Sequence, residues 1–365
     1  MTDNAAVEAK QDASNNTDEV IIVAVDNGYA DQKAAFWSVK DGKPVIDAQG
    51  EPEITQVLLP SRAQIGAINI DINGMSSGVY RIDGQPWTVG RDVTEPESIR
   101  GERYAYSEMN AVLVNHTLIK SGFSGRKIRL ATGLPFGQIY RDGDVNTALV
   151  ERVKESLKSE VIPQGQSKAP IIVAHEVFPE STAAFVDYAI DCKTGTMALE
   201  LETGMAVVDI GGNTTDITYI NPIEGEGSEQ QSYTMNRERS GSKNIGVLNV
   251  RDRLRELIKQ RFKVDSLRDS QLDKALRSGV CKIFGAEEDV SEQIGIAKRD
   301  VVKKLMNYVE EMVGDAADLD FILFVGGGSA VLQDVISEYK HARVPKDPQF
   351  ANARGMLKYM TYVRN

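Results

Sequence analysis

The sequence predicts an α/β fold divided into two domains. Short, β-branched apolar runs alternate along the chain with longer segments whose apolar residues recur at helical spacing, a pattern typical of sheets flanked by helices. A strand followed by an aspartate, a glycine and a polar turn occurs in both halves of the chain. The length of 365 residues also favours two domains over one. We therefore expect two domains built on largely parallel or mixed sheets.

The first half begins with a buried strand. Residues 20–28 form a near-continuous apolar run, as expected for a strand covered on both faces. Residues 34–40 and 44–49 are expected to continue this sheet as antiparallel strands. Helices then alternate with strands in the order helix 106–122, strand 127–135, helix 144–160 and strand 169–181.

The second half repeats this order after a boundary near residues 198–203. We therefore assign a first domain to residues 20–200 and a second to residues 201–349. The polar residues 1–19 are expected to be a disordered tail. The elements expected in the second domain are a strand at 206–210, helices at 249–262 and 292–314, and a strand, glycine turn and helix over 320–340.

Composition argues against two classes of protein. The formal net charge of −11 disfavours direct binding of nucleic acid, because phosphate contacts need a basic surface. No apolar run reaches the length of a membrane span, and the N-terminus lacks the apolar core of a signal peptide. Cys192 and Cys281 have neither zinc nor redox spacing. We expect a cytoplasmic protein with no membrane partner.

Two turns with the same pattern indicate the chemistry. In "AVDNG", Asp26 is followed by Asn27 and Gly28, and in "VVDIGGNTTD", Asp209 is followed by two glycines. Glycine lets a ligand approach the backbone, and successive N–H groups in such turns bind anions. A carboxylate beside them can hold Mg²⁺ through water. Two such turns facing each other would clamp a polyphosphate between two domains.

A third glycine cluster and a proline-glutamate pair extend this pattern. In "FVGGGSAV", residues 326–328 are glycines between a strand and a helix, where backbone can approach a flat ligand and the helix N-terminus favours an anion. Glu180 follows Pro179 at a predicted helix start, where an acidic residue also has an ordinary structural reason. One Asp-x-Gly alone is most often a simple β-turn. Asp216 is open to a role within its own turn, and a structural role is favoured for His116 and His175.

These motifs resemble those of a known family. The two aspartate turns and the triple glycine resemble the first phosphate, second phosphate and adenosine motifs of the actin, Hsp70 and hexokinase superfamily. "EVFPESTAAFVDY" resembles the segment that carries a catalytic glutamate in the ParM/StbA family of plasmid segregation ATPases. "LVNHTLIKSGF", "GLPFGQIYR" and "FANARGMLKYM" also resemble this family. The resemblance runs from about Val20 to the C-terminus.

The resemblance implies a two-domain, actin-like (ribonuclease H-like) ATPase fold with the nucleotide in the interdomain cleft. Residues 350–365 would return to the first domain. Asp26 and Asp209 would flank Mg²⁺ through water, and Glu180, with Asp209, would be catalytic. Other residues implied to bind nucleotide are Asn27, Gly28, Lys33, Gly211, Gly212, Asn213, Thr214, Gly241, Ser242, Gly326, Gly327 and Gly328.

The first turn departs from the usual pattern of the superfamily. Tyr29 and Ala30 stand where a serine or threonine normally follows the glycine, so no hydroxyl is available there. This form is similar to the Asp-x-Gly-Tyr turn of archaeal and Alp-type actin-like proteins. Phosphate contact at this turn would then rest on backbone N–H groups.

The resemblance implies a filament-forming ATPase that drives plasmid segregation. ATP, with GTP as an alternative, would bind with Mg²⁺ and promote head-to-tail self-assembly. A DNA-binding adaptor of the ParR type would link the filament to DNA. The alternatives are a small-molecule kinase of the same superfamily, a chaperone-type nucleotide switch, and a scaffold that binds nucleotide without hydrolysing it.

Overall fold

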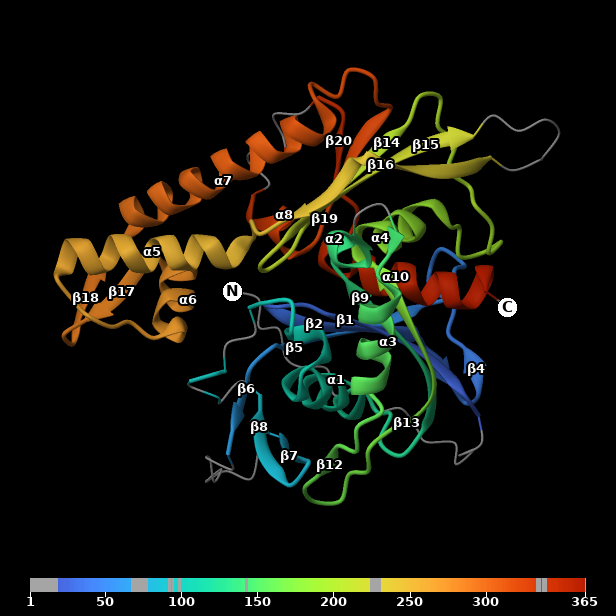
Figure 1. Cartoon of the computed structure of the whole chain (residues 1–365), viewed down its shortest axis with the longest axis horizontal. Coiled ribbons are helices and arrows are strands. Elements are labelled where there is room, and N and C mark those ends of the chain that lie inside the picture. Colours follow the sequence, from blue (N-terminus) through green and yellow to red (C-terminus); the bar gives the residue numbers. More distant parts are fainter. Residues whose placement is uncertain are drawn as a thin grey trace.

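The structure is a computed structural model that describes residues 19–66, 78–90, 93, 95–97, 100–141, 144–223, 231–332, 336 and 340–364. The tail expected over residues 1–19 lies outside these residues except for Glu19. Figure 1 shows two sheet-based lobes, one above the other, and an arm that extends from the upper lobe. The predicted α/β fold with two mixed sheets is confirmed.

The first lobe is built on a five-stranded sheet in the order β13-β9-β1-β2-β5. Strand β1 runs antiparallel to β2 and parallel to β9. The strands are β1 (Ile21–Asn27), β2 (Asp31–Trp37), β5 (Ile54–Pro60), β9 (Lys127–Leu134) and β13 (Ile171–Pro179). Four of these were predicted, and β5 was not.

The strand predicted over residues 44–49 is wrong. Asp41 and Gly42 turn the chain back with φ of 53° and 72°. Strands β3 (Val39–Lys40) and β4 (Lys43–Pro44) therefore pair only with each other, in an exposed hairpin. The neighbour of β2 is instead β5, which begins ten residues after Pro44 and pairs along the whole length of β2.

Helices cover both faces of the first sheet. Alternate residues of β1 divide between them: Val23 and Val25 pack with α1 (Glu108–Lys120), and Ala24 packs with α10 (Ala351–Lys358). Ser107 caps α1, because its side chain accepts a hydrogen bond from the backbone N–H of Asn110 at 3.1 Å. A third helix, α3 (Thr147–Ser156), packs against β13.

A smaller sheet beside the first was not predicted, because its strands have only two to five residues. Its order is β12-β7-β8-β6. The strands are β6 (Ala63–Ile65), β7 (Gly78–Ile82), β8 (Gln85–Val89) and β12 (Ile162–Pro163). Other short elements of this lobe are η1 (Tyr104–Tyr106), α2 (Phe136–Ile139), β10 (Tyr140–Arg141) and β11 (Asp144–Val145).

The second lobe repeats the topology of the first. Its sheet has the order β16-β15-β14-β19-β20, with β14 antiparallel to β15 and parallel to β19, as β1 is to β2 and β9. The strands are β14 (Met205–Ile210), β15 (Thr215–Ile223), β16 (Ser232–Lys243), β19 (Phe321–Val325) and β20 (Ala342–Arg343). The repeated strand-and-turn pattern of the sequence thus corresponds to two sheets of the same topology.

The arm of the second lobe carries the two long helices that were predicted. In Figure 1, α5 and α7 run along each other, with α6 and a hairpin at the far end. Leu254 and Ile258 of α5 pack with Val301 and Leu305 of α7 in the core of this lobe. The elements are α5 (Val247–Phe262), α6 (Asp269–Ser278), β17 (Val280–Ile283), β18 (Ala286–Asp289) and α7 (Ser291–Val313).

Two helices lie between the lobes. Helix α4 (Glu180–Ala189) contacts β14 and β15 of the second lobe, and α10 contacts α4 and strands β1, β2 and β9. Figure 1 shows this pair in the centre of the molecule. The remaining short helices are α8 (Gly327–Val331), η2 (Pro348–Phe350) and a terminal π-helical turn, η3 (Tyr359–Val363). No helix of the described residues is long and apolar enough to span a membrane.

The buried side chain of His116 makes the stability of the first lobe sensitive to acid. His116 is 5% exposed, its Nδ1 lies 2.8 Å from the Tyr80 hydroxyl, and burial, followed by the charge of Lys120, lowers its pKa to about 4. The unfolded chain, with a histidine pKa near 6.5, takes up this proton more readily. The contribution of neutral His116 to the free energy of unfolding is therefore complete above about pH 6.5 and is lost as pH falls to about 4 and below. The loss amounts to up to about 3 kcal/mol.

We expect His116→Gln to reduce this pH dependence. The variant cannot take up the proton, so its free energy of unfolding should fall less than that of the wild type between about pH 6.5 and about pH 4. Urea titrations across this range measure the difference. Parallel pH profiles for the two proteins would contradict the account.

Candidate functional site

A pocket between the lobes collects most of the residues that the sequence singled out. It is bounded by the turn after β1, the turn after β14, the start of α4 and the turn after β19. The predicted site residues that line it are Asp26, Asn27, Gly28, Lys33, Glu180, Asp209, Gly211, Gly212, Thr214 and Gly326. Asn213, Gly241, Ser242, Gly327 and Gly328 do not line it.

The first turn is organised by an ion pair. Asp26 and Lys33 are opposite each other in the antiparallel β1–β2 pair, and Lys33 Nζ lies 3.0 Å from Asp26 Oδ2. Burial opposes the charge on Lys33, but Asp26 and Asp31 prevail and raise its pKa above the usual value. Gly28 leaves room for this arrangement, since an added β-carbon would lie 3.0 Å from Lys33 Nζ. The turn therefore presents a buried, charged lysine to the pocket.

The second turn points backbone N–H groups away from α5. The N–H groups of Val247 and Leu248, at the start of α5, donate to the carbonyls of Gly211 and Gly212 at 3.1 and 2.8 Å. Because C=O and N–H of a trans peptide point in opposite directions, the N–H groups of Gly212 and Asn213 face away from the helix. Consecutive N–H groups oriented in this way form an anion-binding nest.

Asp209 is fixed by a residue from the C-terminal helix. Asn352 Nδ2 donates to Asp209 Oδ2 at 2.7 Å, and both side chains are buried. Burial raises the pKa of Asp209 to about 7; the Asn352 hydrogen bond opposes this shift, and nearby Asp216 and Asp26 add to it. A cation at this position would therefore favour the ionised form of Asp209.

Asp216 joins the two lobes instead of serving only its own turn. It accepts hydrogen bonds from the Thr214 hydroxyl at 3.1 Å and from the Phe136 N–H of the first lobe at 2.8 Å, and it also bonds Ser242. Ser242 Oγ in turn accepts from the Gly137 N–H at 2.6 Å. Burial raises the pKa of Asp216 to about 6. In this conformation Ser242, predicted to contact nucleotide, connects the lobes.

Glu180 lies at the first position of α4, directly after Pro179. It sits over Gly133, where an added β-carbon would lie 2.8 Å from Glu180 Cγ. Burial, followed by the charges of Asp26, Asp216 and Asp209, raises the pKa of Glu180 well above its usual value. The carboxyl group thus faces the pocket from a fixed position between the two phosphate-type turns.

The triple glycine has three different environments. Gly326 has φ of 82°, and an added β-carbon would lie 2.3 Å from Asp209 Oδ1 and 2.5 Å from the Ile210 carbonyl oxygen. Gly328 is pressed against Ile210, while Gly327 has open space around its β position. Gly326 is therefore required both by its backbone and by its contact with the site.

We expect Gly326→Ala to disrupt the site and Gly327→Ala to preserve the fold. The first change forces a left-handed backbone and a clash with Asp209, at a cost of about 1–3 kcal/mol. Thermal unfolding and calorimetric nucleotide titration of both variants measure the difference. Equal stability of the two variants would contradict the geometry described for Gly326.

Three pocket residues were assigned no role from the sequence: Tyr104, Gln138 and Asn352. Gln138 and Asn352 lie in two of the segments that resemble the family, but no single position in them was identified as part of the site. Tyr104 belongs to no recognised motif. Its ring centroid lies 5.2 Å from that of Tyr29, and its hydroxyl accepts a hydrogen bond from Gln32 Nε2 at 2.9 Å. The residue that replaces the missing hydroxyl of the first turn is thus held against a second tyrosine. Asn352 lies 143 positions from its partner Asp209, a separation that no local pattern reveals.

The side chains of the pocket fit a divalent cation bound together with phosphate. Among its lining residues, Asp26, Glu180 and Asp209 are acidic and Lys33 is basic, and the charge of Asp216 lies close enough to act on Glu180. Within the described part of the chain, no three His, Cys, Asp or Glu side chains form a direct metal cage. Mg²⁺ retains several waters and uses few carboxylates with substrate phosphates. Asp26 and Asp209 would hold such an ion through water, where it would neutralise phosphate charge.

Two family models match most of the chain. The model described as "Plasmid segregation protein ParM, N-terminal" matches residues 49–190, and that described as "Archaeal actin homologue MreB-like, C-terminal" matches residues 207–338. Curated proteins gave no match. The first match covers the first lobe from residue 49 onward, without β1 and β2, and the second match covers most of the second lobe.

Solved structures of actin-like proteins share the fold. A 15-stranded ParM filament from Clostridium botulinum has a TM-score of 0.72 at 18% identity, with 94% of this chain and 99% of that chain covered. An archaeal actin homologue in complex with ADP has a TM-score of 0.68 at 20% identity, with the same coverage. A Bacillus thuringiensis ParM with ADP has a TM-score of 0.57 at 16% identity, covering 95% and 99%. The chain therefore has the actin-like fold, and it matches a ParM-type model in its N-terminal region and an MreB-like model in its C-terminal region.

Proposed function

We propose that this chain is a cytoplasmic, filament-forming ATPase that segregates DNA. ATP binds with Mg²⁺ in the pocket between the lobes and promotes head-to-tail assembly. Hydrolysis then destabilises the filament. The observation that carries the proposal is the convergence of both aspartate turns, Gly326 and Glu180 on one interlobe pocket.

The proposed chemistry needs positioning and charge stabilisation, and no covalent intermediate. Backbone N–H groups of the second turn and the Lys33 ammonium bind the phosphates. Glu180 orients the attacking water, and Asp209 and Asp26 hold the water shell of the metal. Because these groups come from two lobes, hydrolysis requires the pocket to be closed.

Self-assembly is supported by the likeness to ParM proteins, one of which was solved as a filament. Head-to-tail contacts do not close on themselves and generate such open filaments. An adaptor that binds DNA, of the ParR type, would supply the link to plasmid DNA.

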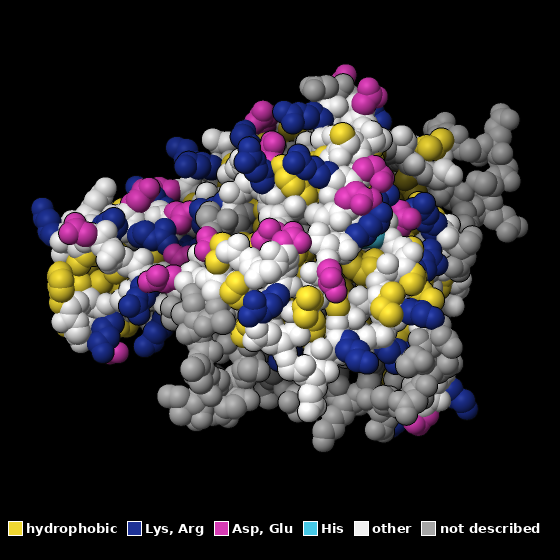
Figure 2. Space-filling model, turned by 60° about the horizontal axis from the view of Figure 1, so that its bottom comes forward, with side chains coloured by type: hydrophobic (Ala, Val, Ile, Leu, Met, Phe, Trp, Pro, Cys, Tyr) yellow, Lys and Arg dark blue, Asp and Glu magenta, His cyan; other side chains and the backbone are white. Residues whose placement is uncertain are grey.

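An adaptor is also favoured by the charge of the chain. The net charge is −11, and Figure 2 shows Lys and Arg interspersed with Asp and Glu over the visible face. Double-stranded DNA is normally bound by a continuous basic surface. The small-molecule kinase alternative is not favoured, because both matched models describe actin-like proteins.

Light scattering and phosphate release, followed together after addition of Mg-ATP or Mg-GTP, test the proposal. We expect scattering to rise first and phosphate release to lag behind it. Comparison of the two nucleotides then measures how strongly the protein prefers adenine over guanine. ADP formation that needs a small acceptor and yields no free phosphate, without any scattering, would overturn the proposal in favour of a kinase, because a kinase transfers the phosphoryl group to the acceptor.

A further inference from the structure

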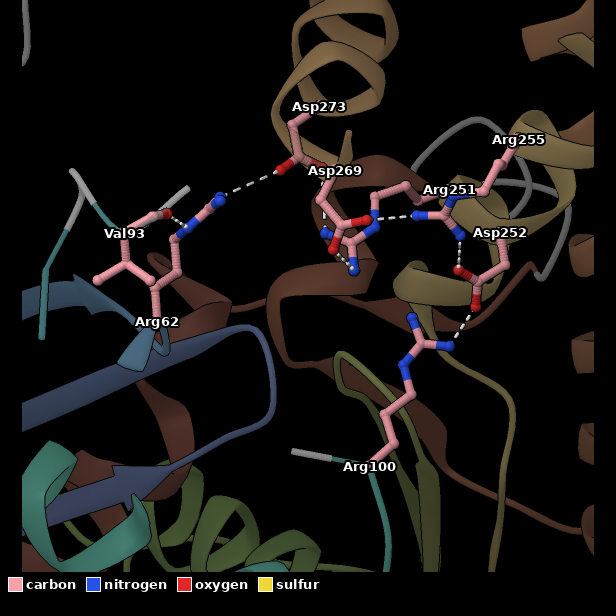
Figure 3. Close-up of polar contacts among 8 residues, drawn as sticks. All are labelled: Arg62, Val93, Arg100, Arg251, Asp252, Arg255, Asp269 and Asp273. Carbon is pink, nitrogen blue, oxygen red and sulfur yellow. Dashed lines mark hydrogen bonds and ion pairs between the residues drawn. The ribbon is translucent and has the colours of Figure 1, made fainter. Parts of the chain in front are cut away.

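An ionic cluster joins the lobes beside the pocket. Figure 3 shows its side chains, which come from the first lobe on one side and from α5 and α6 on the other. We call it the interlobe network, and it consists of Arg62, Arg100, Arg251, Asp252, Arg255, Asp269 and Asp273.

Two contacts of the network cross between the lobes. Arg62 Nη1 lies 3.8 Å from Asp273 Oδ2, and Arg100 forms an ion pair with Asp252. The acceptors are held in place from within their own lobe. Arg255 Nη1 lies 2.8 Å from Asp252 Oδ1, and Arg251 lies 3.5 Å from Asp273. Each carboxylate therefore keeps one arginine partner if the lobes separate.

The first-lobe arginines are coupled to the first turn. Ser61, which precedes Arg62, donates its hydroxyl to the Gly28 carbonyl at 2.7 Å and its N–H to the Ala30 carbonyl at 3.0 Å. Gly101, which follows Arg100, accepts a hydrogen bond from the Tyr29 hydroxyl at 3.4 Å. Both arginines thus stand one residue from a direct contact with the first turn.

The carboxylate side is coupled to the second turn. Helix α5, which carries Asp252 and Arg255, donates its first N–H groups to the carbonyls of Gly211 and Gly212. Asp252 lies four residues after Leu248, so about one helical turn separates it from these contacts. A change in the spacing of the two turns therefore changes the spacing of the two sides of the network.

We propose that the interlobe network is an electrostatic latch that holds the pocket closed and limits the rate of nucleotide release. It rests on the proposed function, because the retained ligand is a nucleotide. The network side chains are 14–32% exposed, so each cross-lobe pair is weakened but not abolished by solvent. Between about 0.1 M and about 1 M salt the screening length falls from about 10 to about 3 Å, so the latch should open as salt rises.

The decisive measurement is the dissociation rate of a fluorescent, non-hydrolysable ATP analogue from unassembled protein. We expect Arg100→Ala and Asp252→Ala each to speed release about threefold or more, and Arg62→Ala to act in the same direction. The effects of Arg100→Ala and Asp252→Ala should not add in the double variant, because both remove one contact. Release from the wild type should also speed up with salt.

Arg253→Ala is the matched control. Arg253 lies on the same helix but pairs with Asp300 and Glu256 inside the second lobe. The Arg253→Ala variant should release the nucleotide analogue at the wild-type rate. Additive effects of the two changes, or an equal effect of Arg253→Ala, would overturn the latch.

Small-angle X-ray scattering without nucleotide separates failure of the latch from failure of the proposed function. If the wild type binds no nucleotide, the proposed function fails, but Arg100→Ala should still enlarge the radius of gyration relative to Arg253→Ala. Equal radii for these two variants and the wild type would overturn the latch. If nucleotide binds normally, but its release rate changes neither with salt nor in Arg100→Ala, the latch is overturned and the proposed function still stands.

Discussion

Glu180→Gln is expected to lower the rate of ATP hydrolysis by about 100-fold or more while leaving assembly intact. The amide has nearly the same shape as the carboxyl group and fits above Gly133, but it cannot accept a proton from the attacking water. Filaments formed with Mg-ATP should therefore persist after those of the wild type have disassembled. Phosphate release and light scattering of the same sample measure the two effects separately.

Glu108→Gln is the control for this change. Glu108 is also the first residue of a helix, α1, but it is exposed and does not line the pocket. The substitution removes a glutamate carboxylate at an equivalent helical position. The Glu108→Gln variant should therefore hydrolyse ATP at the wild-type rate. If Glu180→Gln hydrolysed ATP as fast as Glu108→Gln, Glu180 would not be the residue that orients water.

Gly355→Ala is expected to cost about 3 kcal/mol or more of unfolding free energy. Helices α4 and α10 approach each other so closely that an added β-carbon at Gly355 would lie 1.7 Å from the Ala183 carbonyl oxygen. Neither backbone can yield without moving a helix, and overpacking of this kind is costly. Movement of α10 would also withdraw Asn352 from Asp209, so nucleotide binding should weaken as well.

Gly295→Ala should instead raise the free energy of unfolding. Gly295 lies inside helix α7, and an added β-carbon there would meet only the end of the flexible Arg299 side chain, at 3.3 Å. Alanine is the better helix former by up to about 1 kcal/mol. Denaturant titration of both variants tests the pair, and destabilisation of similar size at the two sites would contradict the close helix contact.

The core of the fold was predictable from local patterns. The strands that end at Asn27 and Ile210 are continuous apolar runs that stop at an aspartate and a glycine, a combination visible in any short window. Helices α5 and α7 have apolar stripes over several turns. Strand β5 was missed because its residues, apart from the exposed Leu58, are half-buried on both faces, and its sequence shows no clear alternation of apolar and polar residues.

The parts of the site that depend on distant segments were not predictable in the same way. Asn352 reaches Asp209 only because α10 packs between the lobes, and Asp216 reaches Phe136 only because the lobes meet. Ser242 was assigned to the nucleotide by resemblance, whereas here it bonds Asp216 and Gly137. Such contacts depend on the arrangement of the lobes, which local spacing does not encode.

Hydrogen exchange with and without Mg-ATP tests the central claim most directly. If the nucleotide is clamped between the lobes, backbone amides of residues 26–30 in the first turn and 210–214 in the second should be protected together. Amides of residues 326–329 should gain protection with them. Protection confined to one lobe, or found only away from these three segments, would contradict the account.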